Sequence, residues 1–155
     1  MNARRFDEAL AQARRGYELD RDFPLARHWL GLALAATGRY DEAIALGAEV
    51  PPDSPILPIG LFISAYANAR AGRRAEAERI VAQMHAAEKT HYVRPYYIAC
   101  VWSALGDKDK AFAELERSLA EKDCYIPRMR VDPFLDPLRD DPRFSSLLKR
   151  MNLPG

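Results

Sequence analysis

The stretch PLARHWLGLALAATGRYDEAIALGAEVPPDSPIL, residues 24–57, decides the fold of this 155-residue chain. It contains two apolar-periodic segments separated by Gly38. The glycine recurs as Gly72 and Gly106, and both intervals are 34 residues, since 72 − 38 = 34 and 106 − 72 = 34. A self-similar unit of this length, with a small residue at its turn, is typical of stacked helical hairpins.

Small residues recur with the same period inside the two expected helices. In the first helix of each hairpin they are Gly31, Ala65 and Ala99, and in the second Ala43, Ala77 and Ala111. Small side chains let two helices approach closely. Glycine adopts the left-handed conformation that often ends a helix without a side-chain clash, so we expect that conformation at Gly38, Gly72 and Gly106.

The first block resembles the tetratricopeptide repeat. The matching residues are Leu30, Gly31, Gly38, Tyr40, Ala43, Ile44 and Pro55. The later blocks depart from the pattern at Arg74 and Lys108, which replace the turn tyrosine, and at Asp123, which replaces the closing proline. The resemblance implies an all-α fold, a right-handed superhelical solenoid of antiparallel helix hairpins with a C-terminal capping helix.

The repeat register divides the chain into five segments of a single domain. We expect the second helix of an incomplete repeat at 1–22, three repeats at 24–57, 58–91 and 92–123, and an Asp-Pro-rich segment with a capping helix at 124–155. The chain is thus expected to open halfway through a repeat. A helix face left without its neighbour favours self-association, for which Phe6, Leu10 and Tyr17 are the candidate residues.

The C-terminal segment contains Asp132-Pro133, Asp136-Pro137 and Asp141-Pro142. Each pair places a capping side chain before a residue suited to the first helical position, and the last is expected to start a helix. The segment resembles the end of tetratricopeptide regions in bacterial multidomain regulators. The resemblance implies an N-terminal partner domain of the winged-helix, protein kinase or nucleotide cyclase type.

Composition argues against several classes of function. With 23 basic and 22 acidic residues, the chain has no basic excess for phosphates, so direct nucleic-acid binding is not expected. No apolar run reaches the roughly 20 residues of a membrane span, and no signal peptide is recognised. We therefore expect a cytoplasmic protein without a membrane span.

The sequence offers no catalytic motif, phosphate loop or metal-ligand spacing, so we expect neither an enzyme nor a cofactor nor a metal site. Cys100 and Cys124 are far apart in sequence, and the first is expected to be a packed thiol. His28, His85 and His91 are scattered.

In the tetratricopeptide family the first helices line a concave groove, and the register assigns residues of this chain to it. The expected binding residues are His28, Leu32, Phe62, Tyr66, Arg70, Tyr96, Cys100 and Ser103. These are mostly apolar or aromatic, which favours an apolar peptide or protein segment over an acidic C-terminus.

Three hypotheses of function remain open. The first is a protein–protein interaction module within a larger regulator. The second is an oligomerisation scaffold, a homodimer through the N-terminal helix, whose groove is filled by its own tail through Phe134, Leu135 and Leu138. The third is a small-molecule sensor, because aromatic-lined cavities accept apolar ligands.

Overall fold

The computed structural model describes the backbone of residues 3–151 and the side chains of residues 7–151. Every secondary-structure element assigned in this range is helical, which confirms the all-α class. The chain divides between Tyr92 and Val93 into two compact units, called unit 1 and unit 2 below.

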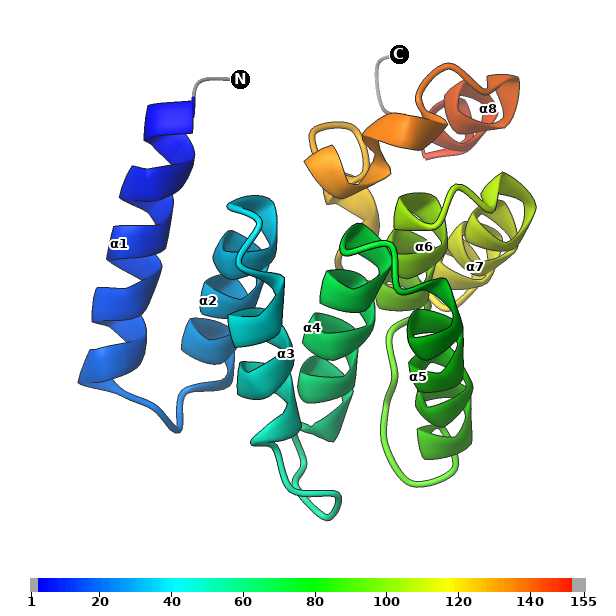
Figure 1. The fold of residues 1–155 in the computed structure, drawn as a ribbon. Helices are drawn as coiled ribbons and strands as arrows, with labels where there is room; N and C mark the ends of the chain where they lie inside the picture. The colour runs from blue at the N-terminus through cyan, green and yellow to red at the C-terminus, as the bar shows by residue number, and fades with distance from the viewer. Residues whose placement is uncertain (1–2, 152–155) are drawn as a thin grey trace. The chain divides into compact units, whose positions relative to one another are not determined.

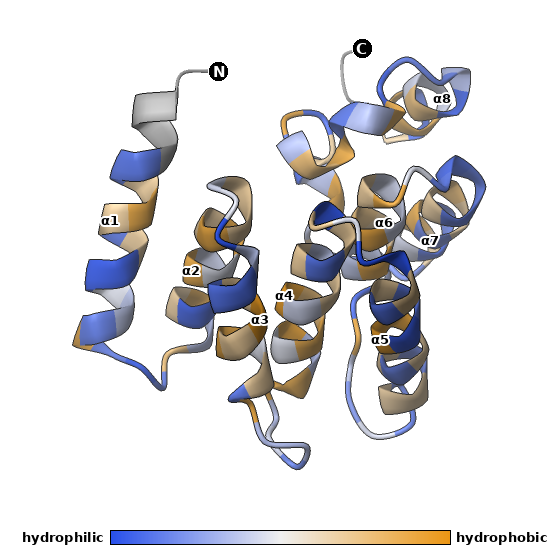
Figure 2. Cartoon of the chain, in the orientation of Figure 1, coloured by the Kyte–Doolittle hydropathy of each residue, from blue (hydrophilic) through white to orange (hydrophobic). Residues whose placement is uncertain are grey.

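Unit 1 contains five helices in the described residues. They are α1 (Ala3–Leu19), α2 (Pro24–Ala36), α3 (Tyr40–Ala48), α4 (Leu57–Arg70) and α5 (Arg74–Ala87). Helices adjacent in sequence pack side by side, and α2 also contacts α4 (Figure 1). Figure 2 shows α1 mainly in hydrophilic colours and α4 mainly in pale and hydrophobic ones. The helices therefore stack in chain order, with α4 in the interior of the unit.

Unit 2 contains one hairpin followed by the C-terminal segment. Its elements are α6 (Pro95–Ala104), α7 (Lys108–Ala120), the 3₁₀ helices η1 (Ile126–Arg128) and η2 (Pro133–Leu138), and α8 (Pro142–Arg150). Helix η2 packs on α6, while η1 and α8 pack on α7.

The three repeat glycines occupy the left-handed region, as predicted. Their φ angles are 77° at Gly38, 76° at Gly72 and 77° at Gly106. After each first helix the chain turns back through the same backbone pattern. The amide of Arg39, for example, donates to the carbonyl of Leu34 at 2.9 Å.

Small residues bring the helices of unit 1 close together. A Cβ added at Gly31 would lie 2.6 Å from the Ile63 side chain, and one added at Gly47 would lie 2.5 Å from the carbonyl oxygen of Gly60. Backbone of α3 therefore approaches backbone of α4. The second-helix alanines Ala43, Ala77 and Ala111 are each 0% exposed, which confirms the packing role predicted for them.

Two of the three Asp-Pro pairs cap helices as predicted. Asp132 accepts a hydrogen bond from the amide of Phe134, and Asp141 from that of Arg143. The prediction for Asp136 was wrong, because Pro137 lies inside η2. Asp136 instead pairs with Arg139, at 2.6 Å between Oδ1 and Nε. A 3₁₀ helix of this length continues through the proline instead of restarting at it.

Candidate functional site

An exposed apolar patch lies at the N-terminal end of α2. Phe23, which precedes the helix, is 50% exposed, Leu25 is 44% exposed and Trp29 is 42% exposed. Leu25 and Trp29 are four residues apart, so their side chains are neighbours on one face of the helix. We call these three residues the α2 patch. Farther along α2, the predicted groove residue Leu32 is 5% exposed.

A row of packed rings extends from the α2 patch into unit 1. Trp29 meets His28 edge-on at 5.3 Å between ring centroids, and His28 stacks with Phe62 at 5.8 Å. Phe62 in turn lies 6.0 Å from Tyr66. The last three residues are at most 2% exposed. These predicted groove residues therefore form the support behind the patch, and only its Trp29 end is open to a partner.

Arg70 ends the row on α4, and its side chain is exposed. Its Nη1 donates to the hydroxyl of Tyr66 at 3.1 Å, and its guanidinium lies 6.0 Å from the centre of that ring. The hydrogen bond with Tyr66 raises the pKa of Arg70 above its usual value. A permanent positive charge is thus held against the aromatic row.

The predicted groove residues of unit 2 are covered by the C-terminal segment. The Tyr96 hydroxyl donates to Oδ2 of Asp132 at 2.9 Å, and the Ser103 hydroxyl donates to the carbonyl of Phe134 at 2.9 Å. Tyr96, Cys100 and Ser103 are each 1% exposed. Burial raises the pKa of Tyr96 and that of the Cys100 thiol, which keeps both side chains neutral.

Arg139 stabilises this covering segment through hydrogen bonds to its backbone. Its Nη1 donates to the carbonyl of Arg130 at 2.6 Å and its Nη2 to that of Asp132 at 3.2 Å. The guanidinium also lies 5.4 Å from the centre of the Phe144 ring. Leu135 and Leu138 are 0% exposed beneath it. In unit 2 the tail therefore covers the face of α6 that carries Tyr96, Cys100 and Ser103.

The residues predicted for self-association lie in α1. Leu10 is 7% exposed, and Tyr17 is half-buried with its hydroxyl accepting from Nη2 of Arg27 at 2.8 Å. Both therefore contact their own unit. The side chain of Phe6 lies outside the described residues.

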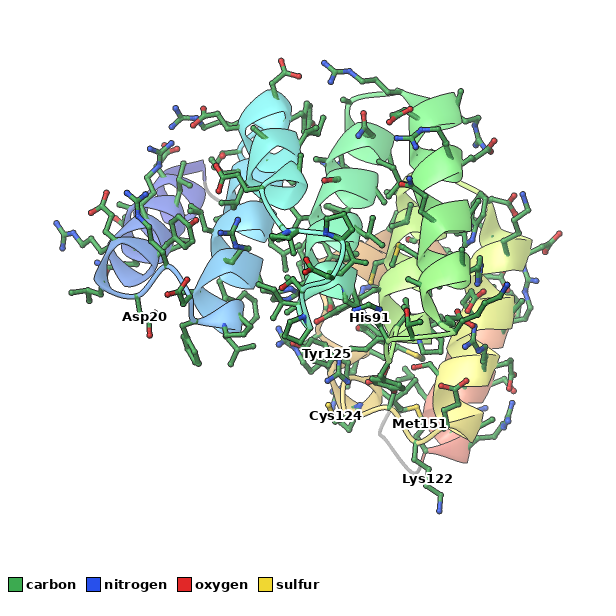
Figure 3. The ribbon with its side chains drawn as sticks, turned by 90° about the horizontal axis from the view of Figure 1, so that it is seen from below. Asp20, His91, Lys122, Cys124, Tyr125 and Met151 are labelled. Atoms are coloured by element: carbon green, nitrogen blue, oxygen red, sulfur yellow. The ribbon has the colours of Figure 1, made fainter. Side chains whose placement is uncertain are left out.

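The remaining chemical groups are dispersed. Cys100 and Cys124 are both free thiols, the first buried as predicted and the second exposed in the loop after Lys122 (Figure 3). Among the described residues no group of three potential metal ligands occurs. Within the same range, no helix has both the length and the apolar character needed to cross a bilayer.

Sequence reasoning did not identify Phe23 and Trp29 as candidate binding residues. The family register selects one set of positions along each first helix, which in α2 includes His28 and Leu32. Trp29 directly follows His28 and does not belong to that set. The pair Leu25 and Trp29, one helical turn apart, is the signal that could have found the patch.

Comparison with known families supports the resemblance for part of the chain. Residues 1–55, which include α1, α2 and α3, match the family model described as tetratricopeptide repeat. The comparisons with curated proteins and with solved structures gave no match. Tetratricopeptide repeats generally mediate protein–protein interactions and are typically non-catalytic.

Proposed function

We propose that the chain is a non-catalytic protein–protein interaction module within a larger bacterial regulator of the cytoplasm. It binds an apolar segment of a partner protein at the N-terminal end of the first helix α2, beside the predicted groove residues. The observation that carries this proposal is the exposed α2 patch of Phe23, Leu25 and Trp29. Large apolar side chains grouped on an otherwise polar surface are typical of protein interfaces.

The packing behind the patch suits it to binding. Trp29 contacts His28, which is held by Phe62, so the indole rests on a buried and close-packed row. A side chain that is already ordered loses little conformational freedom when a partner docks. Tryptophan is also among the residues that most often dominate binding energy at interfaces. We therefore assign the anchoring role to Trp29.

The C-terminal segment suggests the chemistry of the partner. On α6 it places two leucines, Leu135 and Leu138, against the helix and accepts a hydrogen bond from Ser103. The residue of α2 equivalent to Ser103 is Ala35, which offers no hydroxyl. A segment bound at α2 would therefore depend on apolar side chains, in short turns like those of residues 131–138.

The test is affinity capture from a lysate of the source cells with three versions of the whole chain. They are the wild type, the double variant Leu25→Ser/Trp29→Ala and a control, Leu19→Ser, whose side chain is 88% exposed outside the patch. We expect one protein to be retained by the wild type and the control but not by the double variant. Equal retention by all three would contradict the proposal. Circular dichroism verifies that each remains helical.

A second candidate function, an oligomerisation scaffold, is favoured by one observation in α1. Ala9 occupies the position of Ala43 and Ala77, which are 0% exposed, yet Ala9 is exposed. Ala9 is therefore exposed at a position whose counterparts are packed, and a second copy would cover it. Light scattering should then show a dimer that Ala9→Glu converts to a monomer. A wild-type monomer at high concentration would exclude this function.

A further inference from the structure

Unit 1 contains two equivalent clefts, each above a first helix and between two second helices. The first, here the α1–α3 cleft, has a volume of about 310 Å³ and a floor formed by Leu30 and Leu34 of α2. The second, here the α3–α5 cleft, has a volume of about 380 Å³ and lies above α4. The lining residues of the two clefts correspond at the repeat interval, so the same site is built twice.

The floor of the α3–α5 cleft departs from the repeat. At the positions of Leu30 and Leu34 it has Ser64 and Asn68. The third repeat is apolar there as well, with Ile98 and Trp102. Asn68 is 2% exposed and Ser64 is 8% exposed, so both polar side chains lie deep in the unit. The other repeats have large apolar side chains at these positions. Ser64 and Asn68 therefore give the otherwise apolar α3–α5 cleft a polar floor.

The amide of Asn68 has hydrogen-bonding capacity left over. Its Nδ2 donates to the carbonyl of Ser64 at 2.9 Å, and no hydrogen bond engages its Oδ1 among the described residues. An amide nitrogen carries two hydrogens, so Nδ2 retains one donor beside the Oδ1 acceptor. Because Oδ1 is not fully enclosed by the protein, it can be reached from the cleft that Asn68 lines, and a bound molecule could take the place of solvent there.

The walls and rim of the α3–α5 cleft define the rest of the ligand. Its walls include Ile44, Val50, Leu61 and Ile80, all apolar. At the rim, Nε of Arg79 donates to Oε2 of Glu76 at 2.9 Å, so one acid and one base offset each other. A neutral ligand with an apolar body fits this surface better than an ion does.

The rims of the two clefts also differ at one pair of corresponding positions. At the α1–α3 cleft, Nη2 of Arg14 contacts Oε2 of Glu42 at 2.9 Å across the opening. The corresponding residues of the second cleft are Ala48 and Glu76, so the acid remains but the arginine is replaced by a methyl group. The ion pair at the rim of the first cleft therefore has no counterpart at these two positions of the second.

We propose that the α3–α5 cleft binds a small neutral molecule with an apolar body and a carboxamide-like head. The head donates to Oδ1 of Asn68 and accepts from its second Nδ2 hydrogen, while the body lies between Ile44 and Ile80. A volume of about 380 Å³ is within the usual range for small-molecule sites. The site is independent of the α2 patch and of the partner protein proposed for it.

The test uses cyclohexanecarboxamide as the probe and the whole chain, observed by NMR of backbone and side-chain amides. We expect saturable shifts at Asn68, Ser64 and Ile80. Cyclohexanecarboxylate, which has the same body and a charged head, should bind at least tenfold more weakly. Shifts of equal size at Leu30 and Leu34 would indicate nonspecific apolar binding and would overturn the proposal.

Two variants convert the cleft to the form of its counterpart. Asn68→Leu introduces the floor residue of α2, and Ala48→Arg introduces the arginine of α1, which can reach Glu76. Each should weaken probe binding at least tenfold. Ala48 is exposed, so its substitution keeps the test valid even where Asn68→Leu fails to fold. Arg14→Ala, at the rim of the other cleft, should leave probe binding unchanged. Unaltered binding in both Asn68→Leu and Ala48→Arg, or absence of wild-type shifts, would refute the site.

Discussion

The first helices α2 and α6 have corresponding positions but opposite exposure. Leu25 and Trp29 of α2 are 44% and 42% exposed, whereas Val93 and Tyr97, two repeat intervals later, are 2% and 4% exposed. Tyr125, from the segment after α7, packs edge-on against Tyr97 at 5.6 Å between ring centroids. A first helix therefore does not determine by itself whether its apolar positions are available, because a following segment can cover them.

The largest effect should come from removing apolar packing between the covering segment and α6. Leu135→Ala deletes a side chain that is 0% exposed, and we expect it to destabilise unit 2 by about 2–5 kcal/mol. Urea unfolding measures the change. Val131→Ala is the control, because Val131 is 73% exposed and should change stability by about 0.5 kcal/mol or less. Equal effects of the two substitutions would show that the segment does not cover α6 in solution.

A smaller loss of stability is expected when one hydrogen bond between α6 and the covering C-terminal segment is removed. Tyr96→Phe removes the hydroxyl that donates to Asp132 at 2.9 Å and leaves a buried carboxylate oxygen without that donor. The expected loss is about 1–3 kcal/mol. Tyr92→Phe, at a residue that is 58% exposed, serves as the matched control in the same unfolding measurement. An unchanged midpoint for Tyr96→Phe would mean that the contact contributes nothing to the cover.

On the uncovered helix, substitution should affect binding far more than stability. Trp29→Ala is expected to cost about 1–2 kcal/mol, less than Leu135→Ala, since nearly half of the side chain is already exposed. The unfolding midpoint of this variant should therefore lie closer to that of the wild type than the midpoint of Leu135→Ala does. A loss as large as that of Leu135→Ala would place Trp29 in the core of the unit and remove the contrast with α6.

The smallest expected effect is a pH dependence of stability that comes from Asp141, the residue that caps the N-terminus of α8. Hydrogen bonds from the Arg143 side chain lower the pKa of Asp141 to about 2. Because the folded pKa is lowered, the carboxylate's contribution is complete above its usual pKa of about 4 and is lost as pH falls toward 2. Melting curves of wild type and Asp141→Asn should therefore differ at pH 5 and converge near pH 2. If the melting temperatures of the two proteins differed equally at pH 5 and near pH 2, ionisation of Asp141 would not be the cause of the difference.

Local rules predicted the helices and their ends well. The left-handed glycines, the buried alanines and the caps at Asp132 and Asp141 depend on neighbours in sequence, so their residue types indicate them directly. The cap predicted at Asp136 failed because a local pattern cannot reveal that the preceding turn continues through Pro137.

The candidate site was harder to predict because exposure depends on distant segments. His28 and Phe62 follow the groove register, yet both are buried in a ring stack, and Trp29 beside them is the exposed member. Ser64 and Asn68 are visible as polar exceptions once the repeats are aligned. What the alignment cannot show is that both face one cleft.

The near contact of Gly47 with the carbonyl of Gly60 has a mechanical consequence. Where two helices touch backbone to backbone, no side chain between them can change rotamer and let one slide over the other. The seam between α3 and α4 should therefore be stiff. On the opposite wall, Ile80 of α5 meets the cleft through a side chain and not through backbone. Thermal breathing of the cleft should consequently be one-sided, a hinge-like motion of α5 against a fixed pair of helices.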